Sequence, residues 1–178
     1  MCIRDRPKAL SNNIKPKVFF LNQSSGTNSF FQSNSDSNET YGNQLKQIGQ
    51  TTVECTTLDN YLFSNHIKSV DLLKLDLQGG EIAALNGTTK SLKSGIVKCI
   101  LCEIMFEKHY KNQPNAGKLL NLLINEYGFT LFNFYQHNYH HGKLIYADAL
   151  LIHSDIVSDV TKISKNTFLP FSKYPLLK

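Results

Sequence analysis

The segment LLKLDLQGGE at residues 72–81 constrains the fold of this 178-residue chain more than any other segment. An apolar run ends at the carboxylate of Asp76, the pair Gly79-Gly80 follows, and Glu81 begins a stretch with helical spacing. Adjacent glycines allow a tight turn, because a residue without a β-carbon adopts backbone angles that other residues avoid. The order predicts a strand, a turn and a helix, with acidic groups at the carboxyl end of the strand. Open α/β sheets bind their ligands at that end.

Other strands and helices are predicted on both sides of this unit. The apolar run 70–77 is typical of a parallel strand that is covered on both faces. Thr57 and Asn115 suit the N-cap positions of two helices, and Gly128 suits the end of the second. A polar loop is expected at 22–43, and the last two strands are expected to form a hairpin. The predicted strands lie at residues 17–21, 28–32, 51–56, 70–77, 97–106, 129–135 and 144–153.

Composition limits the class of protein. A chain of 178 residues, of which 41% are hydrophobic, can form one domain with a sizeable core. Its apolar runs are all shorter than the roughly 20 residues that cross a bilayer. The net charge is +5, and the lysines are scattered rather than gathered with aromatic residues, which argues against specific nucleic-acid binding. No secretion signal is recognisable, so we expect a cytoplasmic protein without a membrane span.

Cysteine and histidine residues suggest a metal site, but their spacing argues against one. Cys99 and Cys102 lie three residues apart in a predicted strand, which places their thiols on opposite faces. His137, His140 and His141 lack a regular spacing and a nearby carboxylate, so a surface hairpin loop is favoured over a metal site. We therefore predict no metal ligands in this chain.

Several motifs together resemble those of the FkbM-type methyltransferases, a branch of the S-adenosylmethionine-dependent Rossmann-like enzymes. They are TLD…L from residue 57, DLLKLDLQGGE at 71–81, L.G at 85–87, E…F…Y at 103–110, GF.L at 128–131 and DAL at 148–150. The resemblance spans residues 51–153. It implies an α/β, Rossmann-like class I methyltransferase fold with a mainly parallel sheet that ends in an antiparallel hairpin. It also implies S-adenosylmethionine as the cofactor.

Two parts of the family pattern have no counterpart in this chain. In the family, a glycine-rich turn after the first strand holds the methionine part of the cofactor, and an acid after the second strand binds its ribose. Gly26, the first glycine of the chain, stands alone in a polar loop. We therefore expect an amino-terminally truncated methyltransferase domain at 17–155, a scar or disordered start at 1–16, and a loose tail at 156–178. Such a truncation leaves the strand at 70–77 at an exposed edge.

The candidate site consists of three acids and one glycine. Asp76 is the first choice, because a carboxylate at a strand end can attract the cationic cofactor, deprotonate an acceptor hydroxyl or hold a divalent metal. Capping of the next helix is the alternative role for Asp76. Glu103 ends the neighbouring strand, and its proximity to Asp76 should raise one of the two pKa values. Glu81 is the third catalytic candidate, although the helix dipole alone can explain an acid there. The resemblance implies that Asp76 and Gly79 contact the cofactor.

Four further residues near these positions receive other interpretations. Lys74 shares a strand face with Asp76, which favours a structural ion pair. Asp148 lies in an apolar strand and needs a partner. His109 and Tyr110 follow the second strand, and we expect them to be exposed to solvent.

The resemblance implies transfer of a methyl group to a hydroxyl of a sugar, polyketide or related metabolite, so the expected partner is a small-molecule or glycan acceptor. A non-catalytic α/β binding or interaction module is the alternative, because the cofactor turn is missing. Another Rossmann-like enzyme, such as a nucleotide-sugar transferase, is a third possibility. The sequence leaves the oligomeric state open.

Overall fold

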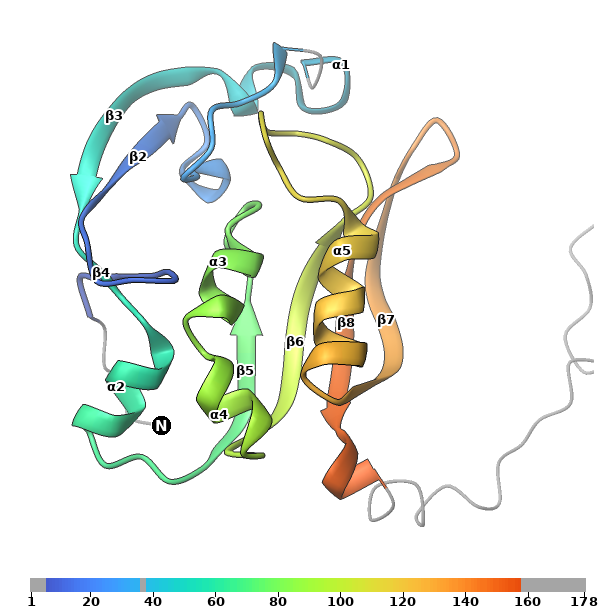
Figure 1. Ribbon diagram of the computed structural model, residues 1–178. Coiled ribbons are helices and arrows are strands. Elements are labelled where there is room, and N and C mark those ends of the chain that lie inside the picture. The colour runs from blue at the N-terminus through green and yellow to red at the C-terminus, as the bar shows by residue number, and fades with distance from the viewer. Residues whose placement is uncertain (1–5, 36–37, 158–178) are drawn as a thin grey trace, which may run out of the picture.

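The computed structural model describes residues 6–35 and 38–157 (Figure 1). Residues 1–5 of the predicted start and 158–178 of the predicted tail lie outside the described residues. The strands are β1 (Ala9–Leu10), β2 (Lys17–Asn22), β3 (Gln47–Val53), β4 (Cys55–Thr56), β5 (Val70–Leu75), β6 (Val97–Met105), β7 (Phe129–His140) and β8 (Lys143–His153). The helices are η1 (Ser25–Thr27), α1 (Asn38–Tyr41), η3 (Gly42–Leu45), α2 (Leu58–Ser64), α3 (Glu81–Asn86), α4 (Thr89–Lys93), α5 (Ala116–Asn121) and the π-helical η4 (Leu122–Glu126). None of them is long and apolar enough to cross a membrane.

The main sheet has four strands in the order β5-β6-β8-β7. β5 and β6 are parallel and are connected through α3 and α4, whereas β8 is antiparallel to both of its neighbours. β5, β6 and β7 therefore run in one direction and β8 runs in the other. The predicted antiparallel hairpin at the end of the sheet is confirmed. A mainly parallel sheet is not confirmed, since β8 lies between β6 and β7 and pairs antiparallel with both. The result is an α/β fold with a mixed sheet.

Two smaller sheets precede the main one. β2 pairs with β3 in an antiparallel ribbon, and β1 pairs with β4 in parallel. The strand predicted at 51–56 is therefore divided between two sheets at Glu54. The strand predicted at 28–32 is absent from the described residues, where Ser29 and Ser33 form only isolated bridges, to Phe20 and Tyr110. Because β1 belongs to the fold, ordered structure begins upstream of the predicted boundary between residues 16 and 17.

Strand β5 is covered on one face only. Leu73 and Leu75 are buried, whereas Leu72 is 53% exposed and Lys74 is also exposed on the opposite face. The prediction that residues 70–77 are covered on both faces is therefore wrong, and the lysine within the apolar run is the sign of a half-exposed strand. In the part of the chain that the structure describes, β5 is an edge of the main sheet, as we expected.

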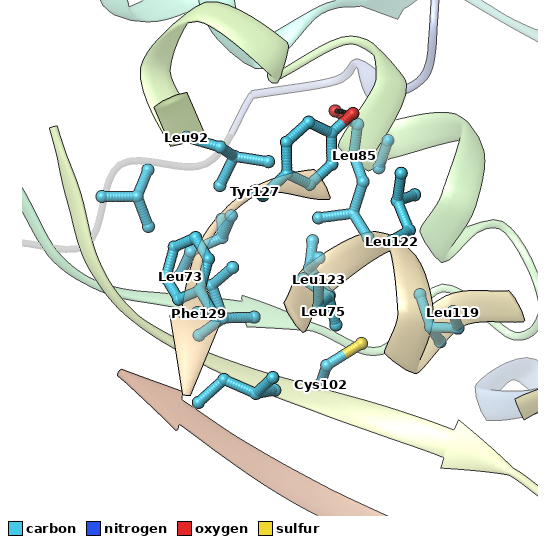
Figure 2. Close-up of a cluster of buried hydrophobic side chains, with 14 of the residues drawn as sticks. Leu73, Leu75, Leu85, Leu92, Cys102, Leu119, Leu122, Leu123, Tyr127 and Phe129 are labelled. Carbon is cyan, nitrogen blue, oxygen red and sulfur yellow. Dashed lines mark hydrogen bonds between the residues drawn. The ribbon is translucent and has the colours of Figure 1, made fainter. Parts of the chain in front are cut away.

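The hydrophobic core lies between the main sheet and the helices α3, α4, α5 and η4, which Figure 1 shows on one side of the sheet. Each fully buried leucine in such a core stabilises the fold by roughly 1.5–3 kcal/mol relative to an exposed one. Cys102 points into this core and Cys99 toward the other face, so the prediction for the two thiols is confirmed. Figure 2 shows the core side chains Leu73, Leu75, Leu85, Leu92, Cys102, Leu119, Leu122, Leu123, Tyr127 and Phe129.

Two helices begin, and one ends, at the residues that the sequence predicts. The Thr57 hydroxyl accepts the amide N–H of Asn60 at 3.1 Å, and the Asn115 side chain accepts that of Lys118 at 2.8 Å. Gly128 follows η4 with a φ of +73°, which a glycine adopts at little cost. These three predictions are confirmed.

Asp59, the acid of the TLD motif, is a second capping residue. Its carboxylate accepts the backbone N–H groups of Lys90 at 3.0 Å and Ser91 at 2.9 Å, at the start of α4. Backbone N–H groups in the first turn of a helix have no partner within the helix, and a carboxylate satisfies them well. Asp59 therefore joins α2 to α4 and has a structural role.

The final hairpin is longer than predicted. β7 and β8 extend to His140 and Lys143, so that only His141 and Gly142 form the loop. Both loop residues have positive φ, at +49° and +77°, as a two-residue type I′ hairpin turn requires. The expected polar loop is therefore wrong for His137 and His140, which belong to β7. Pairing with β8 continues through this polar stretch, with register shifts between Tyr135 and Tyr139, and so extends β7 where composition alone indicates a loop.

Gly87, the glycine of the L.G motif, lies where two segments cross. A β-carbon at this position would overlap the carbonyl oxygen of Ser11, a buried residue that follows β1. We therefore predict that Gly87→Ala lowers the free energy of unfolding by about 1–3 kcal/mol, because the 11–12 backbone must move. Urea denaturation measures the change. Gly26→Ala is the matched control, since nothing lies within 4 Å of its β-carbon position. Equal stability of the two variants would contradict the prediction.

Candidate active site

The parallel pairing of β5 and β6 brings two predicted site residues together. Leu75 pairs with Cys102, and the next residues along the two strands are Asp76 and Glu103. Both side chains lie on the sheet face opposite the helical core, because side chains alternate along a strand. The prediction that these two acids lie close together on neighbouring strands is confirmed, near the carboxyl ends of both, although β6 continues past Glu103 to Met105.

The two carboxylates share a single side-chain amide. Gln78 Nε2 donates to Asp76 Oδ1 at 2.9 Å and to Glu103 Oε2 at 3.0 Å. Lys74 Nζ lies 2.9 Å from Asp76 Oδ2, so the predicted ion pair is present. Both side chains of this pair are partly exposed, and such pairs contribute at most about 1 kcal/mol. Asp76 is thus held on both oxygens.

The environment of Glu103 disfavours its charged form. Burial, the largest cause, and the carboxylates of Asp76, Glu81 and Asp148 raise the pKa of Glu103 to about 8, against the opposing charge of Lys74. Asp148 of β8 pairs directly opposite Glu103 of β6. The prediction that proximity to Asp76 raises one pKa is confirmed, although burial has the larger effect. A carboxyl group with this pKa can take up or release a proton near neutral pH.

Glu81 closes the turn between β5 and α3. Its side chain is buried, and Oε1 accepts the backbone N–H groups of Leu77 at 2.8 Å and Gly79 at 3.3 Å. Burial raises the pKa of Glu81, whereas these backbone hydrogen bonds lower it. The geometry gives Glu81 a structural role, and its part in catalysis stays a prediction.

Gly79 is required by the turn itself. Its φ is +93°, and a β-carbon on it would lie 3.3 Å from the ring of Phe31. The turn is also fixed from the same loop by Ser29, whose hydroxyl donates to the carbonyl of Gln78 at 2.7 Å. The loop at 22–35 therefore packs against the turn, and the contact of Gly79 with a cofactor stays a prediction.

Gln78 and Tyr110 also belong to this group of residues, although the sequence predicted neither of them there. Tyr110 is 1% exposed and His109 is also buried, so their expected exposure is wrong. The Tyr110 hydroxyl lies 2.8 Å from Gln78 Oε1 and 2.9 Å from the carbonyl of Thr27. The signal for Tyr110 was its place in the E…F…Y motif. Gln78 lies between the predicted acids and glycines of the 72–81 segment, but its side chain is uncharged and so did not indicate a catalytic role.

The acids fit a cationic group by charge, but little space adjoins the buried ones. The Asp76 side chain is 43% exposed, so its carboxylate is accessible. The cavity that Glu81 and Glu103 help to line has a volume of about 10 Å³, which is room for about one water molecule. Among the described residues, no three His, Cys, Asp or Glu side chains are arranged to hold a metal ion.

The raised pKa of Glu103 predicts a pH effect on stability. Between about pH 4.5 and 8 the folded chain keeps a proton that the unfolded chain has lost, so stability decreases as pH rises through this range. Glu103→Gln removes this contribution. We expect its free energy of unfolding to fall less steeply than that of the parent, by at most about 1.4 kcal/mol per pH unit. Urea unfolding between pH 5 and 8 measures both curves.

The matched control for this experiment is Glu126→Gln, which removes an exposed carboxylate of η4. Its stability curve should run parallel to that of the parent protein. Parallel curves for Glu103→Gln and the parent would mean that Glu103 has an ordinary pKa in the folded chain.

Residues 3–131 match the family model described as Methyltransferase FkbM domain. The match includes Asp76, Gly79, Glu81 and Glu103, and it starts upstream of the resemblance found at 51–153 and ends before β8. No curated protein and no solved structure matches the chain. The family model covers well over half of the 178 residues and contains the shared-amide pair of acids. The chain therefore belongs to the FkbM methyltransferase family.

Proposed function

We propose that this methyltransferase transfers a methyl group from S-adenosylmethionine to a hydroxyl oxygen of a sugar, polyketide or related metabolite, with Glu103 as the base. The observation that carries the proposal is the pair of carboxylates at the ends of β5 and β6. Asp76 and Glu103 share the amide of Gln78, and the pKa of Glu103 is raised to about 8. A pKa in this range suits a group that must accept a proton near neutral pH.

The topology supports a Rossmann-like origin of the main sheet. β5, the helices α3 and α4, and β6 form a strand-helix-strand crossover with parallel strands. The acids lie at the carboxyl ends of these strands, where α/β sheets bind ligands. The strand order along the chain is also that of the second half of the methyltransferase sheet implied by the resemblance. We infer that β5 to β8 are that half.

Glu103 has one oxygen held and one available for chemistry. Gln78 donates to Oε2, and no described residue donates a hydrogen bond to Oε1. A hydroxyl oxygen that gains a methyl group must lose its proton, and Oε1 is the atom that takes it. The fixed Oε2 limits rotation of the carboxylate, so that the base is oriented before the acceptor binds. The fraction of molecules with an ionised Glu103, the form that can act as a base, therefore increases as pH rises through the pKa of Glu103.

The residues present fit S-adenosylmethionine through charge. When bound, this cofactor supplies a methyl group on a positively charged sulfur. The partly exposed carboxylate of Asp76 would hold that positive charge, and Lys74 balances the carboxylate in its absence. Gly79 is the second predicted contact, at a turn whose inner side is covered by Phe31. Asp76 would thus bind and orient the methyl donor, whereas Glu103 accepts the proton of the acceptor hydroxyl.

One observation favours a second function. The cavity beside Glu103 and Glu81 has a volume of only about 10 Å³, which is too small for either a methyl donor or an acceptor. A non-catalytic α/β binding or interaction module would need no such space. The two functions differ in whether methyl transfer occurs.

We predict that the chain transfers a labelled methyl group from S-adenosylmethionine to at least one member of a panel of hydroxylated metabolites. Glu103→Gln should lower kcat/KM by about 10²–10⁴-fold, because the general base is lost. In the parent protein kcat/KM should rise with pH and level off above about 8, the pKa of Glu103. Asp76→Asn should raise KM for the methyl donor more than it lowers kcat. Scintillation counting of the product measures all three.

Glu107→Gln is the matched control, since Glu107 pairs with Lys143 beyond the end of β6 and lies outside the carboxylate pair. It should retain the parent activity. Full turnover by Glu103→Gln would remove Glu103 from the chemistry. Binding of an acceptor without any methyl transfer by the parent protein would support the non-catalytic module instead.

A further inference from the structure

Gln78 has an unfavourable backbone conformation at the centre of the candidate site. Its φ is +51°, in the left-handed region that favours glycine, although two glycines follow it directly. Residues other than glycine occupy this region at an energetic cost, and such residues cluster at functional sites. We therefore expect contacts that hold the backbone of Gln78 in this conformation and a role for its side chain.

Contacts from two distant segments fix Gln78 in place. The hydroxyl of Ser29, in the loop after β2, donates to its backbone carbonyl at 2.7 Å. The hydroxyl of Tyr110, in the segment after β6, lies 2.8 Å from its side-chain oxygen Oε1. Tyr110 is itself buried, so its hydroxyl has little freedom to move. The side-chain oxygen therefore faces Tyr110, and the nitrogen faces the other way.

That nitrogen bridges the two acids. A glutamine amide nitrogen has two N–H donors, and here one points to Asp76 Oδ1 at 2.9 Å and the other to Glu103 Oε2 at 3.0 Å. Both donors and the acceptor of the amide are thus used. If the amide were rotated by half a turn, its oxygen would face two carboxylates, which is unfavourable when either is ionised. The contacts with the acids therefore set this orientation, and the Tyr110 hydroxyl is compatible with it because it can donate to Oε1.

We propose that Gln78 is a positioning residue: its amide joins the Asp76 and Glu103 carboxylates into one unit, and Tyr110 holds the oxygen end of that amide. The inference rests on the proposed function, because Gln78 acts through Glu103 as the base. Gln78 itself does not take part in the transfer of the methyl group or the proton.

The bridge has a measurable consequence for Glu103. An N–H donor stabilises the ionised form of a carboxyl group, so the amide holds the pKa of Glu103 below the value that its surroundings alone would produce. Loss of the donor should raise that pKa by about one pH unit. The titratable groups that act on Glu103 are the carboxyls of Asp76, Glu81 and Asp148 and the ammonium of Lys74. Four further groups face Glu103, whose charge raises their own pKa values: the thiol of Cys102 and the phenols of Tyr41, Tyr110 and Tyr146.

The test is a titration of the side-chain carboxyl carbon of Glu103 by NMR, in protein labelled with ¹³C at glutamate and with Glu103→Gln used to assign the signal. Gln78→Met keeps the length of the side chain and removes both N–H donors. We expect the pKa of Glu103 to rise above the parent value of about 8 by about one pH unit in this variant. In the methyl transfer assay, the rise of kcat/KM with pH should move by the same amount.

Gln113→Met is the matched control. Gln113 is also a buried glutamine, but its amide binds only backbone groups of Glu107, His109 and Tyr110. This variant should leave the pKa of Glu103 unchanged. An equal rise in both variants would attribute the effect to general loosening of the fold and overturn the proposal.

Tyr110→Phe provides a second variant that keeps the packing of the ring. It removes the hydroxyl that contacts the amide oxygen, and we expect a smaller rise in the pKa of Glu103 than in Gln78→Met. An unchanged pKa in Gln78→Met would overturn the bridge. If Gln78→Met does not fold, an unchanged pKa in Tyr110→Phe would do so. The titration needs no methyl donor, so the bridge can fail while Glu103 remains the base, and the base can fail while the bridge remains.

Discussion

The crowding of negative charge at the turn between β5 and α3 is the constraint on which the rest of the site depends. Three carboxylates converge there, and each is accommodated differently. Glu81 accepts backbone N–H groups, and Asp76 is held by Lys74 and the amide of Gln78. Glu103 has only its share of that amide and lies among the other charges, so its pKa is raised to about 8. The three acids therefore have three roles: Glu81 closes the turn, Asp76 binds the neighbouring ammonium and amide groups, and Glu103 can exchange a proton.

The fold holds these charges in place from two sides. The core between the main sheet and the helices fixes the strands that carry Asp76 and Glu103. Leu75 and Cys102, the preceding residues of those strands, are buried in this core and are labelled in Figure 2. From the other side, the segment after β2 contacts the turn through Ser29 and Phe31. A polar segment without regular strands thus becomes part of the site, because its contacts are made across the molecule and not along the chain.

Much of the local structure could be predicted from the sequence. Thr57, Asn115 and Gly128 act at helix ends as predicted, because capping depends on atoms only a few residues apart. The strand-turn-helix unit at 72–81 was also recognisable, since alternation, paired glycines and the flanking acids are local signals. The errors concern pairing and burial. The length of the final hairpin, the division of the strand at 51–56, the open face of β5 and the burial of Tyr110 all depend on which segments meet, and composition does not specify that.

The sequence by itself determined the chemical identity of the site: acids at the ends of two neighbouring strands, a glycine turn between strand and helix, and a resemblance to one methyltransferase family. Only the tertiary structure decided how those acids are used. Gln78 binds Asp76 two residues away, but its contacts with Glu103 and Tyr110 join residues 25 and 32 positions apart. The physical reason is that burial and proximity set a pKa and the orientation of an amide. Both are properties of the packed molecule, and no short stretch of sequence contains them.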